Sequence, residues 1–205
     1  MANMNAPFGL RLVGMLTGEV QDASIRRYRV PASVGAAVGV GTAVTRINGS
    51  STLTDTNASL NQEEGLLYVG PAAGVAGEAI LGVVTGVCFN PANLSSNYSP
   101  GGVASDVLVC DDPQAIYEVQ SNATGVTNTQ IGMNCLLQSN AVVNAVTGQS
   151  GGVLSTPTSD DTCPLLMVGW SRDPKNDITS PPYVKALVKI NIPQLEAAGS
   201  GAKGV

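Results

Sequence analysis

Histidine is absent from this sequence of 205 residues. A chain without an imidazole cannot form a Ser-His-Asp triad or a zinc site with histidine ligands. The absence matters because residues 148–152 are G-Q-S-G-G and match the G-x-S-x-G pattern of serine hydrolases. Ser150 would need a lysine as its base, and nothing in the sequence marks Lys175, Lys185 or Lys189 as desolvated. We therefore expect no enzyme activity and interpret the segment as a flexible Gly/Ser loop.

Charged and aromatic residues are also scarce. Charged residues make up 12% of the chain, about half of the usual quarter, and aromatic residues make up 4%. The net charge is −5 and no basic run is longer than Arg26-Arg27, so we expect no nucleic-acid partner. The aromatic residues are too scattered to predict a stacking platform for sugars or bases. A surface with few charges leaves room for protein interfaces, whose centres are depleted in charge.

No segment predicts export or insertion into a membrane. The first residues, Met-Ala-Asn-Met-Asn, lack the basic and apolar regions of a signal peptide. The longest apolar stretches, such as Ala76–Phe89, are interrupted by Gly, Glu and Thr. We therefore expect a soluble chain that is not exported and has no membrane partner.

The four cysteines do not predict a metal site or a disulfide framework. Cys88, Cys110, Cys135 and Cys163 are far apart in the sequence and form no C-x-x-C motif. Each lies in an apolar run, where a small buried hydrophobic residue belongs. We expect four reduced thiols in the core, as is usual for proteins assembled in a reducing cytosol.

Other polar motifs have simpler explanations than a cofactor or metal site. The pairs Asp111-Asp112 and Asp160-Asp161 could bind a hard cation, but adjacent aspartates in loops more often cap turns. The glycines of Gly35–Gly41 lack the Lys-Ser/Thr pair of a phosphate-binding loop and indicate a glycine-punctuated strand. We expect no cofactor and no bound metal.

Period-two patterns predict a mainly β fold. In Tyr183–Ile192, Val184 and the alternate residues after it are apolar, while Lys185 and Lys189 share the opposite face. No window of helical length keeps a 3.6-residue period between good caps. The other predicted strands are Arg26–Val30, Val38–Ile47, Leu66–Val69, Ala79–Phe89, Val103–Cys110, Ala115–Gln120, Gln130–Leu137, Ala141–Thr147 and Pro164–Trp170. We expect a β-barrel or β-sandwich with long Gly/Ser/Asn loops and extended terminal arms.

The ends of the chain have few residues that could build a core. Residues 1–14 contain three apolar anchors, Phe8, Leu10 and Leu12, among small residues, and we predict an N-terminal arm that grips a partner. We expect a β-rich body over residues 15–193, with a possible subdivision near residues 90–102. Residues 194–205 are rich in Gly and Ala and predict a flexible tail.

Several sequence segments, taken in order, resemble a known family. They are APFGLR at Ala6–Arg11, GEAILGVV at Gly77–Val84, VLVCDDP at Val107–Pro113, IYEVQ at Ile116–Gln120, VGWSRDPKND at Val168–Asp177 and VKIN at Val188–Asn191. Together they resemble a family of small structural proteins encoded beside the major capsid protein in tailed bacteriophages. The resemblance spans roughly residues 6–195, and the segments contain strand and turn residues without a catalytic signature.

The resemblance implies a head decoration (cement) protein. Such a protein binds the capsid shell, stabilises the mature head, and is found on the capsid surface of virions assembled in the host cytoplasm. Its implied partners are the major capsid protein and further copies of itself, in many cases as a homotrimer. Three alternatives remain: a tail or neck component with the same composition, a host-binding adhesin or carbohydrate-binding module, and a hydrolase that uses Ser150.

Overall fold

The computed structural model describes residues 3–17, 23–50, 65–88, 96–122, 124–179 and 182–194. It confirms the prediction of a mainly β fold that contains a β-barrel. The elements are β1 (Arg11–Met15), β2 (Ile25–Val30), β3 (Ala43–Ser50), β4 (Leu67–Pro71), β5 (Gly82–Val87), β6 (Ser105–Cys110), β7 (Ala115–Gln120), the 3-10 helix η2 (Asn128–Gln130), β8 (Asn134–Cys135), β9 (Leu137–Gln138), β10 (Val153–Leu154), β11 (Leu165–Trp170) and β12 (Lys185–Ile190).

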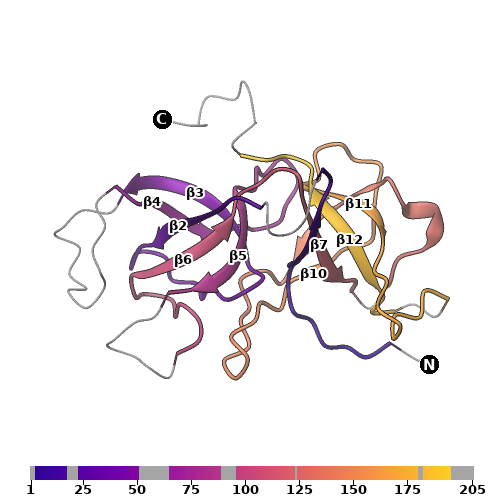
Figure 1. Ribbon diagram of the computed structural model, residues 1–205, viewed down its shortest axis with the longest axis horizontal. Helices are drawn as coiled ribbons and strands as arrows, with labels where there is room; N and C mark the ends of the chain where they lie inside the picture. Colours follow the sequence, from indigo (N-terminus) through magenta and orange to yellow (C-terminus); the bar gives the residue numbers. More distant parts are fainter. Residues whose placement is uncertain are drawn as a thin grey trace.

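Five strands close into a barrel in the order β2-β4-β3-β5-β6, on the left of Figure 1. Most neighbours are antiparallel, and a single parallel pair, Arg29 with Tyr68, joins β2 to β4. Alternation puts valines such as Val107 and Val109 inside, where they pack with Tyr28. Closure leaves this sheet without an open edge.

A five-stranded antiparallel sheet in the order β1-β7-β12-β11-β8 lies beside the barrel (Figure 1). Its core face carries Tyr117 and Val119 of β7 against Ala186 and Val188 of β12, all buried. This hydrophobic cluster continues into the barrel through residues such as Val83. One hydrophobic cluster is therefore shared by the barrel and the sheet, and a second cluster, around Tyr28 and Val107, lies within the barrel alone.

The structure changes the expected division of the chain. The possible boundary at residues 90–102 falls between β5 and β6, which are neighbours in one barrel, and residues 90–95 of it lie outside the described residues. The barrel instead gives way to the sheet between β6 and β7, at residues 111–114. Of the predicted tail, only Gln194 lies within the described residues. Its side-chain Oε1 accepts a hydrogen bond from the backbone N of Arg46 at 2.6 Å, so Gln194 belongs to the packed body.

Candidate functional site

The N-terminal segment is part of the body over residues 10–14, which corrects the prediction of a separate arm. Leu10 is 1% exposed within the shared core, and Leu12 packs against that core from β1. Leu10 can enter the core because the chain passes very close to Gly41 at Gly9, where a side chain would clash. The backbone N of Leu10 donates to Gly41 O at 2.9 Å. Of the three predicted capsid anchors, only Phe8 precedes the core and strand residues, and it is half-buried with Arg11 over its ring.

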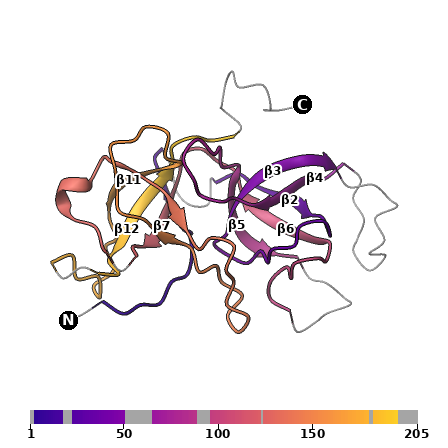
Figure 2. The same ribbon diagram turned by 180° about the vertical axis from the view of Figure 1, so that it is seen from behind.

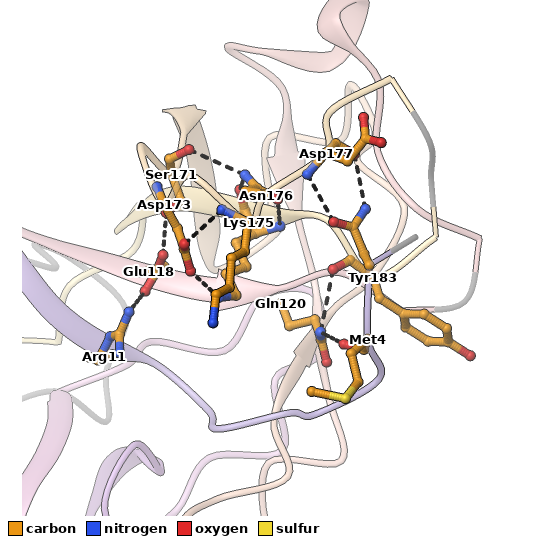
Figure 3. Close-up of polar contacts among 12 residues, drawn as sticks. Met4, Arg11, Glu118, Gln120, Ser171, Asp173, Lys175, Asn176, Asp177 and Tyr183 are labelled. Carbon is orange, nitrogen blue, oxygen red and sulfur yellow. Dashed lines mark hydrogen bonds and ion pairs between the residues drawn. The ribbon is translucent and has the colours of Figure 1, made fainter. Parts of the chain in front are cut away.

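Side-chain amides clamp the residues that precede Leu10 onto the edge of the sheet (Figure 3). Gln120, at the end of β7, donates from Nε2 to Met4 O at 2.7 Å, and its Oε1 accepts from Ala6 N at 3.1 Å. Asn3 forms a similar pair with the backbone of Asp177, with both bonds at 2.9 Å. Each amide substitutes for the backbone of a partner strand, so this segment is held in place without strand pairing.

Charged side chains surround the same segment. Glu118, 2% exposed, accepts hydrogen bonds from Arg11 on β1 and from the Ser171 hydroxyl. Lys185 on β12 pairs with Asp173, and this hydrogen bond is the main reason that the pKa of Asp173 is below its usual value. The Asn176 carboxamide joins the loop that follows β11 to β12. Its Nδ2 donates to Lys185 O and its Oδ1 accepts from Lys185 N, both at 2.8 Å.

A second feature is the loop of residues 139–150, orange in Figure 1, which projects from the body in both views (Figure 1, Figure 2). Two of its valines point away from the core, Val142 at 61% and Val146 at 88% exposed, whereas Val143 between them is half-buried. The segment was predicted to contain a strand at Ala141–Thr147, and the structure instead has turns with one isolated bridge, between Val143 and Ser150.

Internal hydrogen bonds fix the tip of this loop. The Asn144 side chain accepts from Val146 N at 2.9 Å, its backbone N donates to Gln149 O at 2.9 Å, and its carbonyl accepts from Gly148 N at 2.7 Å. From outside the loop, Asn97 Nδ2 donates to Val146 O at 3.2 Å. The two exposed valines are thus presented on a well-bonded turn.

Backbone hydrogen bonds to Val40 attach the base of the loop to the barrel. Val40 N donates to Gly148 O at 3.0 Å, and Val40 O accepts from Ser150 N at 2.8 Å. Gly39 is needed beside it, because a Cβ there would lie 2.2 Å from Gly148 O. The glycine-rich segment Gly35–Gly41 is therefore an extended support with isolated bridges at Val38 and Val40, in place of the predicted strand. Close packing against the loop accounts for the glycines of this segment, and a phosphate-binding role is not needed to explain them.

Ser150 is a buried structural residue, which corrects its interpretation as part of a flexible loop. The side chain is fully buried, its Oγ donates to Asn140 O at 2.9 Å, and the same Oγ accepts from Gly152 N at 3.1 Å. The three lysines considered as bases are not among its hydrogen-bond partners. The hydroxyl therefore supports the loop and is not presented to solvent.

The 139–150 loop also lies in a stretch of sequence whose composition, and not any motif, indicates an interface. Residues 119–159 contain no Asp, Glu, Lys or Arg, and they form the longest such stretch of the sequence, ahead of residues 79–105. Charge depletion is typical of the centre of protein interfaces. A scan for long uncharged segments would have singled out this region, although it could not have shown which side chains are exposed.

The remaining motifs have structural roles. Asp112 and Asp160 cap turns as predicted, through Gln114 N at 2.8 Å and Thr162 N at 2.9 Å. Asp111 is instead buried, where it accepts a hydrogen bond from the Tyr28 hydroxyl at 2.6 Å. Burial, followed by this bond, raises the pKa of Tyr28.

No disulfide links the four cysteines in the part of the chain that the structure describes. Cys110, Cys135 and Cys163 are buried, whereas Cys88 is half-buried. Burial raises the pKa of the Cys135 thiol to about 12. Within the described part of the chain, His, Cys, Asp and Glu side chains form no group of three that could hold a metal ion.

Among the residues that the structure describes, no helix has the length and apolar character needed to cross a membrane. No protein-family model, curated protein or solved structure gives a significant match to this chain.

Proposed function

We propose that this chain is a virion structural protein of a tailed bacteriophage, a head decoration protein that binds the capsid shell through the 139–150 loop. One observation carries the proposal: Val142 and Val146 are exposed on a loop that hydrogen bonds hold rigid, within a segment that contains no charge. The family resemblance of the sequence supports the virion setting. The proposed partners are the major capsid protein and further copies of this chain, as a homotrimer.

A preorganised apolar loop is well suited to repeated weak binding. Burial of an exposed valine contributes about 1.5–3 kcal/mol, and a loop that is already ordered loses little conformational entropy when it docks. A protein that binds only the assembled shell stabilises that shell by mass action. Many equivalent sites on a lattice then make a modest affinity sufficient.

The test adds purified protein to heads that lack it and measures the subunits retained per head. We expect Val146→Asp to lower the binding affinity about 10-fold or more, since a charge would replace about 1.5–3 kcal/mol of apolar burial. Val142→Asp should act in the same direction. The matched control is Val75→Asp, because Val75 is another loop valine, 53% exposed, outside the 139–150 loop. If all three variants bind as the parent does, the loop is not the contact with the shell.

A further inference from the structure

A pocket of about 540 Å³ lies between the clamped N-terminal segment and the loop that precedes β12. Its lining includes three cationic side chains, Arg11, Lys175 and Lys185, and no Asp or Glu. The full chain has only ten Lys and Arg residues and a net charge of −5. Three cations in one concave lining contrast with the negative net charge of the whole chain.

Acidic side chains hold two of these cations from outside the pocket. Arg11 pairs with Glu118, and Lys185 pairs with Asp173, yet neither carboxylate contributes to the lining. Both carboxylates line an adjoining hollow of about 400 Å³, which also contains Arg172. In the described part of the chain, no carboxylate lies within ion-pair distance of the Lys175 ammonium group, although the charge of Lys175 contributes to the lowered pKa of Asp173. Lys175 is thus the cation with most to gain from an anionic ligand.

The walls of the pocket are already ordered. Gln120 is 1% exposed and is fixed by bonds to Met4, Ala6 and Tyr183 (Figure 3). The loop that carries Lys175 is held by the Asn176 carboxamide and by the bond from Lys175 N to Asp173 Oδ1 at 2.9 Å. Ordered walls lower the conformational entropy that a ligand must overcome.

We propose that this pocket binds a compact ligand with two or more carboxylates. The three cations come from β1, from the loop after β11 and from β12, so they surround the space and match several separate anionic groups. The volume is in the range of small-molecule sites. The carboxylates can belong to a free di- or tricarboxylate or to acidic side chains of a partner protein. The site is separate from the 139–150 loop apart from Gln149, and the proposal does not depend on capsid binding.

The experiment measures binding of citrate and of a short polyglutamate peptide to the full-length protein by calorimetry at low ionic strength. We expect at least one probe to bind, with an affinity that falls as salt is added, because the attraction is largely electrostatic. Lys175→Met and Lys185→Met should each weaken binding about 10-fold. The matched control, Lys189→Met, changes a lysine on the same face of β12 that does not line the pocket, and should change affinity less than about twofold.

Binding of citrate alone would identify a free small molecule, and binding of the peptide alone would identify an acidic protein segment. Thermal unfolding of each variant verifies that the fold is intact before affinities are compared. Because Lys185→Met also removes the ion pair with Asp173, Lys175→Met is the decisive variant if the former is unstable. Failure of both probes to bind the parent protein, or equal weakening by Lys189→Met, would overturn the proposal.

Discussion

The side chain of Asn140 pairs with the backbone of Ala43 as a neighbouring strand would. Asn140 Nδ2 donates to Ala43 O at 2.7 Å, and Asn140 Oδ1 accepts from Ala43 N at 2.8 Å. The same Nδ2 also donates to Ala72 O at 2.8 Å. One buried carboxamide therefore attaches the 139–150 loop to the start of β3 and to the segment that follows β4.

We predict that Asn140→Ala destabilises the protein by about 2–4 kcal/mol, because Ala43 N and Ala72 O lose a buried partner and Ala43 O keeps only its bond from Ala72 N. Urea denaturation gives the free energy of unfolding. Asn144→Ala is the matched control in the same loop: its side chain is exposed, so its loss should cost less than about 1 kcal/mol. Similar losses in the two variants would show that the carboxamide of Asn140 does not anchor the loop.

Leu10 should be essential to the core. Leu10→Ala is expected to cost about 2–5 kcal/mol in urea denaturation, as for other large-to-small changes in a packed core. Leu16→Ala, which truncates a leucine that is 47% exposed just after β1, should cost less than about 1 kcal/mol. Deletion of residues 1–14 should unfold the protein, since it removes Leu10 and most of β1 together. A folded, cooperative truncation would restore the interpretation of residues 1–14 as an arm.

Ser150 is expected to matter for stability. Ser150→Ala leaves Gly152 N without its buried acceptor and Asn140 O without its donor, so we predict a loss of about 1–3 kcal/mol. Ser159→Ala is the control, because Ser159 is exposed. Chemical denaturation of both variants compares the two sites. No loss at Ser150 would mean that its hydroxyl is replaced by water or is not buried in solution.

Burial of Cys135 makes stability depend on alkaline pH. Its folded pKa is raised to about 12, whereas an unfolded cysteine ionises near pH 8.5. The stabilising effect is complete below about pH 8.5 and is lost as the pH rises toward the folded pKa, by at most about 1.4 kcal/mol per pH unit. Urea unfolding between about pH 8 and 9.5 should show this decline, with a smaller slope for Cys135→Ala. An unchanged slope would contradict the assignment to Cys135.

The sequence predicted those features that depend on local patterns. The strict alternation of Tyr183–Ile192 corresponds to β12, with Val184, Ala186, Val188 and Ile190 buried and Ile192 half-buried. The burial of Leu10 could not be predicted, because it depends on Gly41 and on core residues distant in the sequence. The predicted strand at Ala141–Thr147 was wrong because the Asn144 side chain accepts a hydrogen bond from Val146 N, two residues further on, and so favours a turn over a ladder.

The candidate interface was missed for a related reason. Val142 and Val146 have strand-forming side chains, and in sequence they cannot be distinguished from core residues. Both valines are exposed because contacts with distant segments fix the position of the loop. Val40, on another segment, bonds the base of the loop, and Asn140, within the loop, bonds Ala43. Only the uncharged composition of residues 119–159 was available without the structure.

The copy number of the protein in purified virions tests the proposed function most directly. Quantitative mass spectrometry of virions from the proposed phage source, with the major capsid protein as internal reference, gives that number. We predict a copy number comparable to that of the major capsid protein, because a decoration protein occupies sites repeated over the whole shell. A stoichiometry of only a few copies per particle would contradict head decoration and would assign the protein to the tail or neck.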